Sequence, residues 1–274
     1  PIYISFVLIL TVVLDFAITK AYQNIKKSLL NNIIIPNEIF HHTLKKNSKG
    51  GGKISNSVYT NSLGFRDFKI RDVEIKKKNK RILLLGDSFT QGIYLEYEDT
   101  YAGMITKHLE KKNIQVLNAA VKSYSPAIYL TKMKYLIEDV GLEFDELFLF
   151  IDISDTFDDL YRYKITDEGN VTEPKMTKYE KDNKVGIIKK TKIFIQNNFT
   201  IVFYISNFIN DLFDPDQYTN DEKDQFRHVI DHYINLWHVD ENFYELYGKK
   251  GLKLNQKYLD ELKVLLDKKN IRLT

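Results

Sequence analysis

The clearest pattern in the chain is an alternation of short apolar runs with longer amphipathic stretches. The apolar runs at 81–85, 115–118 and 146–151 are typical of strands that are buried on both faces of a sheet. Between them, residues 98–109 and 126–140 repeat apolar positions at helical spacing. Strands that alternate with helices of about a dozen residues predict right-handed crossovers and a parallel sheet. We therefore expect an α/β domain with a parallel sheet and flanking helices.

A longer apolar stretch lies at the N-terminus. Residues 2–18 (IYISFVLILTVVLDFAI) carry one charged side chain, Asp15, and lysines follow them. A spanning helix needs about 20 apolar residues, and no small-residue cleavage site of a signal peptide follows here. We predict a transmembrane anchor over residues 1–19 and a single-pass membrane localisation.

The other segments interrupt the α/β alternation. Residues 20–80 are polar and include a glycine-rich stretch, which predicts a juxtamembrane connector. Residues 162–252, rich in Lys, Asp, Asn and Tyr, predict a helical insertion in a domain that spans 81–274. The helical pattern resumes at 255–269, and the strand that should follow it at 271–274 is cut short. We therefore expect the domain to be incomplete at its C-terminus.

Composition narrows the classes of function. The chain has 274 residues, with 40 basic and 37 acidic side chains interleaved, so we expect no nucleic-acid partner. It has no Cys, which excludes disulfides, thiolate metal sites and cysteine nucleophiles. His228 and His232 would share one face of a helix, but solvated or packing histidines are far more common at this spacing than metal ligands. We predict neither a metal nor a cofactor.

The segment that indicates chemistry is residues 86–92 (GDSFTQG), where the first buried strand should turn into a helix. Ligands bind at this carboxyl edge of open α/β sheets. The hydroxyl of Ser88 would be exposed there, and the backbone N–H groups at the helix start could stabilise an oxyanion. A serine that merely caps a helix, or a turn without chemistry, fits the same residues equally well.

Three stretches resemble the conserved blocks of the GDSL/SGNH hydrolases, which are serine esterases on a flavodoxin-like sheet. Residues 86–90 (GDSFT) after 82–85 resemble the first block, 116–126 (VLNAAVKSYSP) the second, and 147–155 (LFLFIDISD) the third. Residues 60–67 (TNSLGFRD) are similar to a stretch of the membrane-anchored members. The resemblance implies an α/β, flavodoxin-like parallel sheet of SGNH hydrolase type, with flanking helices, a helical insertion and an N-terminal transmembrane helix.

The resemblance also implies residue roles. Ser88 would be the nucleophile, and its N–H would be one oxyanion donor. Ser123 stands where the family usually has the oxyanion-hole Gly, a change that is harmless to a backbone donor but harmful if the position needs a positive φ. Ser154 stands where the family usually has an Asn side-chain donor, and its shorter hydroxyl could donate one bond. Supporting positions that would lock the turn or orient neighbours are Gly86, Asp87, Asp152 and Asp155.

The fourth family element, an Asp-x-x-His pair whose His is the general base, has no match in the chain. None of the six histidines has an Asp three residues before it. A serine hydroxyl is a poor nucleophile without such a base. We expect the base to lie beyond Thr274, and this fragment to be inactive alone.

The leading hypothesis is a membrane-anchored serine esterase or O-acyltransferase that acts on ester-linked acyl groups through an acyl-serine. By family analogy its partners would be an acylated small molecule or an exported glycan, the membrane through residues 2–18, and a membrane-embedded acyl donor, with the domain on the extracytoplasmic side. The first alternative is a catalytically inactive SGNH-like binding or assembly component, as Ser123 and Ser154 suggest. The second is a flavin or anion binder that uses residues 86–92 as a phosphate cradle, although the turn lacks a phosphate-loop Lys.

Overall fold

A computed structural model describes residues 2–29, 33–51, 57–93, 95–173, 198–199, 201–202 and 236–274. The chain divides into two compact units. One comprises Pro1–Leu29 with Lys175–Tyr233, and the other comprises Leu30–Pro174 with Ile234–Thr274. The boundaries that we expected for the connector and the SGNH-like domain stay a prediction.

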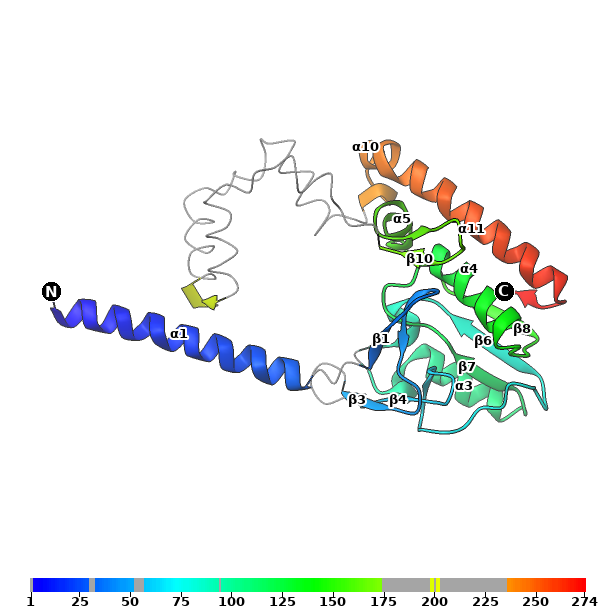
Figure 1. Ribbon diagram of the computed structural model, residues 1–274, viewed down its shortest axis with the longest axis horizontal. Helices are drawn as coiled ribbons and strands as arrows, with labels where there is room; N and C mark the ends of the chain where they lie inside the picture. Colours follow the sequence, from blue (N-terminus) through cyan, green and yellow to red (C-terminus); the bar gives the residue numbers. More distant parts are fainter. Residues whose placement is uncertain are drawn as a thin grey trace. The chain divides into compact units, whose positions relative to one another are not determined.

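The first unit contains helix α1 (Ile2–Leu29), drawn in blue in Figure 1. Asp15 lies in the middle of this helix and is 1% exposed. Its carboxylate accepts hydrogen bonds from the backbone N–H groups of Ile201 (3.1 Å) and Val202 (3.0 Å). Within the described residues, no helix is long and apolar enough to cross a membrane. The transmembrane helix predicted over residues 1–19, and the membrane localisation drawn from it, are therefore wrong. The prediction discounted Asp15, a charge that is costly in hydrocarbon and is bonded to backbone N–H groups in this unit.

The second unit is built on a seven-stranded sheet with the order β11-β8-β6-β7-β5-β4-β3. The strands β6, β7, β8 and β11 run parallel to one another. The strand β5 pairs antiparallel with β7, and β4 and β3 continue the sheet antiparallel. The bounds are β3 Lys49–Gly51, β4 Ser57–Thr60, β5 Arg66–Asp67, β6 Arg81–Leu85, β7 Gln115–Asn118, β8 Glu146–Leu149 and β11 Arg272–Leu273. The sheet is mixed, so the prediction of a parallel flavodoxin-like sheet is wrong. The physical reason is that segments expected to form a connector pair with the free edge of β7 instead.

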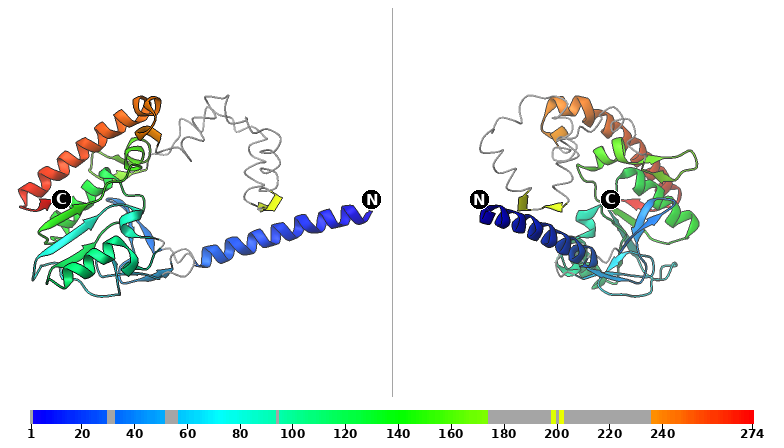
Figure 2. Two further views of the ribbon diagram at one scale, coloured as in Figure 1. Left: turned by 180° about the vertical axis from the view of Figure 1, so that it is seen from behind. Right: turned by 60° about the vertical axis from the view of Figure 1, so that its left-hand side comes forward.

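The parallel strands divide the core into two layers. Leu83 and Leu85 pack on one face with Leu130 and Leu262, and Leu84 packs on the other face. This alternation follows from the two-residue period of a strand, and it explains why β6 is apolar along its whole length. The helices α4 (Pro126–Lys134) and α11 (Lys249–Lys268) lie along one another on the first face (Figure 1). Helix α3 (Tyr101–Glu110) covers the opposite face (Figure 2).

Short helical elements complete this unit. The helices α2 (Ser88–Gln91) and η1 (Tyr97–Asp99) precede α3, and the π-helical turn η2 (Tyr135–Asp139) extends α4. After β8 come α5 (Asp155–Phe157) and η3 (Asp158–Arg162). Before α11 come η4 (Leu236–His238), α10 (Glu241–Phe243) and η5 (Tyr244–Gly248). The helices expected at 98–109, 126–140 and 255–269 are thus present, with shifted ends.

Two antiparallel hairpins lie beside the sheet. One consists of β1 (Ile34–Asn37) and β2 (His41–Leu44), and the other of β9 (Lys164–Ile165) and β10 (Val171–Thr172). A single bridge between Phe40 and Val171 connects them. The second hairpin and η4 to η5 belong to the insertion predicted at 162–252. Most of that insertion, with His228 and His232, lies outside the described residues.

Candidate functional site

Ser88 is the first residue of α2, at the carboxyl end of strand β6. The side chain of Asp87 caps this helix by accepting a hydrogen bond from the N–H of Phe89 (2.9 Å). Gly86 allows the turn, because a Cβ there would lie 2.2 Å from the Thr90 hydroxyl and 3.1 Å from the carbonyl oxygen of Phe150. The sequence GDS therefore produces a tight strand-to-helix turn that places a serine at the sheet edge.

The hydroxyl of Ser88 is half-buried and donates a hydrogen bond to Oδ2 of Asp87 (3.2 Å). Burial raises the pKa of Asp87, and the charge of Asp152 raises it further, while hydrogen bonds from Phe89 and Ser88 oppose the shift. The carboxylate of Asp87 thus bonds to both the turn and the Ser88 hydroxyl. Within the described part of the chain, no imidazole lies within hydrogen-bond distance of this hydroxyl.

Ser123 follows the neighbouring strand β7 and has a positive φ of 61°. Its loop is bonded directly to α2. The N–H of Lys122 donates to Oε1 of Gln91 (2.7 Å), and the amide of Asn118 donates to the carbonyl of Thr90 (2.8 Å). The N–H of Ser123 has no hydrogen-bond partner among the described residues. The structure therefore joins the Ser88 and Ser123 segments, and it places Ser123 in the conformation for which a Gly is the better residue.

Ser154 lies after strand β8, immediately before α5. Both its N–H (2.8 Å) and its hydroxyl donate to Oδ1 of Asp152. The hydroxyl has one proton to donate, and that proton is directed at the neighbouring carboxylate. In this arrangement the hydroxyl of Ser154 offers no donor to a ligand.

Three buried or partly buried carboxyl groups, those of Asp155, Asp158 and Asp159, follow Ser154 along the chain. Asp155 is fully buried, and burial, followed by the charges of Asp87 and Asp159, raises its pKa to about 9. Its Oδ2 accepts hydrogen bonds from the Tyr129 hydroxyl (3.0 Å) and the N–H of Asp152 (3.3 Å), whereas Oδ1 has no partner. At neutral pH Asp155 is therefore a protonated acid.

Two further carboxyl groups in this region were not anticipated as site residues. Burial raises the pKa of Asp159 to about 6, and it accepts hydrogen bonds from Ala127 N–H (3.2 Å) and from the amide of Asn255 (2.7 Å). Burial likewise raises the pKa of Asp158 to about 7. The four-residue spacing of Asp155 and Asp159 could have indicated that both carboxyl groups lie on one face of a helix. Their partner Asn255 could not be found in this way, because it is about 100 residues away in the sequence. Across the described ranges, no group of three His, Cys, Asp or Glu residues is arranged to hold a metal ion.

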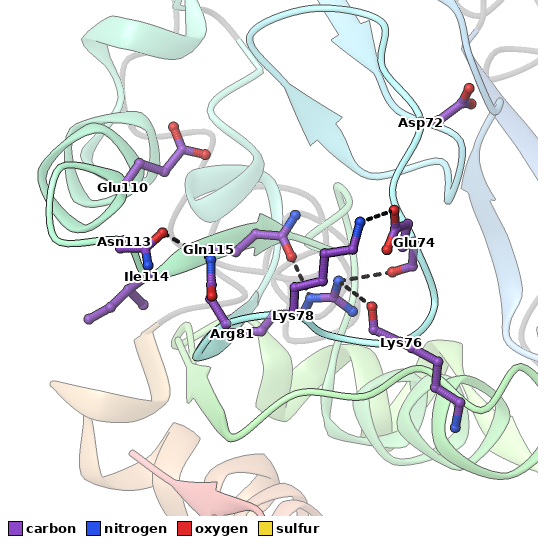
Figure 3. Close-up of a pocket in the computed structure, with 10 residues that line it drawn as sticks. Asp72, Glu74, Lys76, Lys78, Arg81, Glu110, Asn113, Ile114 and Gln115 are labelled. Atoms are coloured by element: carbon purple, nitrogen blue, oxygen red, sulfur yellow. Dashed lines mark hydrogen bonds and ion pairs between the residues drawn. The ribbon is translucent and has the colours of Figure 1, made fainter.

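A polar cavity of about 340 Å³ lies at the other, amino end of the parallel strands (Figure 3). Its base is Arg81, whose guanidinium donates to Gln115 Oε1 (2.6 Å) and to four carbonyls, those of Glu74 (2.9 Å), Ile75 (3.0 Å), Lys76 (3.4 Å) and Glu143 (2.9 Å). Arg81 and Gln115 are the first residues of β6 and β7, so this cavity is separate from the Ser88 turn. The arginine here connects segments of the fold and has no donor left for a ligand.

Comparisons with known proteins give a distant likeness. No protein-family model and no curated protein matches the chain. Among solved structures, the SGNH-hydrolase family esterase AlinE4 matches with 20% identity and a TM-score of 0.26, over 30% of this chain and 44% of that chain. A point mutant of esterase AlinE4 matches with the same values. The match thus spans less than half the length of that esterase.

Proposed function

We propose that the chain is a serine ester hydrolase or acyltransferase whose nucleophile is Ser88 and whose substrate is an acylated small molecule or glycan. The observation that supports this most is the pairing of two features at one sheet edge. A serine hydroxyl lies at the N-terminus of α2. The N–H of Ser123, which has no partner in the described part of the chain, lies on a loop bonded to that helix through Gln91. A nucleophile and a backbone N–H donor are two of the parts that acyl transfer needs, and the third is a base.

In the proposed reaction, Oγ of Ser88 attacks the ester carbonyl carbon and gives its proton to a base. The carbonyl oxygen becomes an oxyanion, which the N–H groups of Ser88 and Ser123 stabilise. The C–O bond to the alcohol breaks, and the alcohol leaves with the proton. Water, or the hydroxyl of an acceptor, then attacks acyl-Ser88 and restores the serine. Asp87 orients the hydroxyl. We assign the role of the base to an imidazole. The chain has no Asp-x-x-His pair that would supply it, so the test below adds imidazole.

A second candidate function is a non-catalytic binding component on the same scaffold. One observation favours it. The hydroxyl of Ser154 donates to Asp152 and therefore supplies no third oxyanion donor. Each such donor is worth roughly 10²- to 10³-fold in rate. The two candidates differ in whether Ser88 reacts.

The test is hydrolysis of p-nitrophenyl acetate by the purified chain, with and without added imidazole as an external base. Relative to the imidazole blank, we expect wild-type protein to hydrolyse the ester and Ser88→Ala to lower the rate by roughly 10³-fold or more. Ser48→Ala is the matched control, because its hydroxyl bonds to the Lys46 carbonyl at an exposed turn. Equal rates for wild type and Ser88→Ala, with both proteins folded, would contradict catalysis and favour the binding component.

A further inference from the structure

The peptide group between Lys122 and Ser123 is held by a histidine from a distant hairpin. Nε2 of His42, in strand β2, lies 2.7 Å from the carbonyl oxygen of Lys122. This carbonyl and the N–H of Ser123 belong to one planar peptide group and point in opposite directions. A bond that fixes the direction of the carbonyl therefore also fixes the direction of the Ser123 N–H.

The hydrogen-bond partners of His42 determine its tautomer. A carbonyl oxygen can only accept, so Nε2 of His42 carries the hydrogen. Its other nitrogen, Nδ1, lies 2.7 Å from Nδ1 of His41 and accepts from it when His42 is neutral. Burial lowers the pKa of His42 to about 4, so the ring is neutral at neutral pH. The donor to Lys122 is thus present in one defined form.

His42 itself is held in place by further contacts, which do not involve Lys122. The residue is 8% exposed, and its carbonyl accepts a hydrogen bond from the Tyr124 hydroxyl (2.7 Å). That hydroxyl in turn accepts from Nζ of Lys132 (3.1 Å), which also donates to the carbonyl of Ala119 (2.7 Å). The ring of Tyr124 packs against the ring of His42 at 5.0 Å between centroids. These contacts give the imidazole little freedom to move away from Lys122.

The same segment is held from the opposite side by the helix that carries Ser88. Gln91 of α2 accepts the N–H of Lys122 (2.7 Å), so Lys122 has one backbone bond to His42 and one to Gln91. Ser123, with φ of 61°, needs such support, because a residue other than glycine leaves this conformation easily. A hydrogen bond to the carbonyl also polarises the peptide group and strengthens its N–H as a donor.

We propose that His42 is a positioning residue that aims and polarises the Ser123 N–H for an oxyanion. This role rests on the function proposed above, since it requires an acyl group on Ser88. His42 does not touch the substrate. Its contribution is made in the transition state, when charge develops on the carbonyl oxygen, so it acts on kcat and leaves KM nearly unchanged.

The test compares His42→Gln with His42→Asn in the ester-hydrolysis assay at fixed imidazole. The amide nitrogen of Gln reaches the position of Nε2 and keeps the donor, whereas the shorter Asn does not. We expect His42→Asn to lower kcat about 10-fold with KM within about twofold of wild type, and His42→Gln to recover most of the loss. His108→Leu, at an exposed position of α3, is the control and leaves kcat unchanged.

A second measurement separates positioning from general damage. In ¹⁵N–¹H spectra of the folded chain, the Ser123 amide signal should shift in His42→Asn and stay near its wild-type place in His42→Gln. If Ser88→Ala abolishes hydrolysis while His42→Asn keeps the wild-type kcat, His42 has no positioning role and the proposed function stands. If Ser88→Ala has no effect, the proposed function fails, and the role of His42 fails with it.

Discussion

The two ends of the same parallel strands are built in opposite ways. At the amino end, Arg81 is 2% exposed and its guanidinium is bonded to five acceptors, which come from three segments of the chain. The carboxylate of Asp145 beside it also has partners. Burial opposes the shift, but hydrogen bonds from Lys77 and from the N–H of Arg81 lower its pKa. Charges at this end are paired, which stabilises the fold.

At the carboxyl end, two polar atoms have no partner among the described residues. Asp155 keeps its proton because ionisation would leave a buried charge, and its Oδ1 has no partner. Ser123 has a positive φ and, among the described residues, its N–H has no acceptor. Such unfavourable groups cluster at functional sites, and this end of an open α/β sheet is where ligands bind. The difference indicates that the amino end serves stability, and it is consistent with the chemistry that we propose for the carboxyl end.

The largest effect on stability should come from the amino end. Arg81→Met keeps the apolar stem but leaves several buried carbonyls without a donor, so we expect it to lower the free energy of unfolding by about 3 kcal/mol. Urea unfolding monitored by circular dichroism measures this. Lys78→Met is the control from the same cavity; its side chain is 77% exposed, and a change below about 0.5 kcal/mol is expected. A loss at Arg81 no larger than at Lys78 would remove the distinction between the two ends.

At the carboxyl end, Asp155 should make stability depend on pH. In the unfolded chain its pKa is near 3.8, so it is ionised at neutral pH, whereas in the folded chain it stays protonated up to about pH 9. The folded state therefore binds one more proton, and the contribution of Asp155 to stability falls as pH rises through this range. Between about pH 6.5 and 9, wild type should lose about 1 kcal/mol per pH unit relative to Asp155→Asn.

This difference is measured by urea unfolding of both proteins at several pH values. Asp139→Asn is the control, because Asp139 is exposed and its replacement should leave the pH profile parallel to that of wild type. Parallel profiles for Asp155→Asn as well would mean that Asp155 is ionised in the folded protein.

The smallest effect concerns the backbone at Ser123. Ser123→Gly removes the side chain from a left-handed conformation and should stabilise the chain by about 1 kcal/mol while it keeps the N–H donor. Asn113→Gly is the matched control, since Asn113 has φ of 60° but asparagine tolerates this region. Its gain should be smaller. If Ser123→Gly loses stability, the conformation at Ser123 is not unfavourable and the comparison of the two ends weakens.

The sequence predicts those elements of the fold that can be recognised from their own residues. The strands at 81–85 and 115–118 are present because each is a short apolar run that buries both faces. The antiparallel strands β3 and β5 could not be found in this way, because Lys49–Gly51 and Arg66–Asp67 are short and polar and are strands only through their partners. The error at α1 has a similar origin. The apolar run predicts a membrane span, but the sequence does not show that distant backbone N–H groups donate hydrogen bonds to Asp15.

The residues of the candidate site also differ in whether their partners are local in the sequence. The turn at Ser88 is visible in the sequence because Gly86, Asp87 and Ser88 act on one another directly. His42 carries no such signal, since its partner Lys122 lies 80 residues away. The pKa of Asp155 likewise depends on burial under helices that come from other parts of the chain.

The most direct test of the account is the reactivity of Ser88 itself. The folded chain is treated with a serine-reactive fluorophosphonate, with imidazole present, and the adduct is located by peptide mass spectrometry. The account predicts one phosphonyl group on the peptide that contains Ser88, and none on the Ser88→Ala protein. A folded chain that stays unmodified at Ser88, or that reacts at other serines instead, would contradict it.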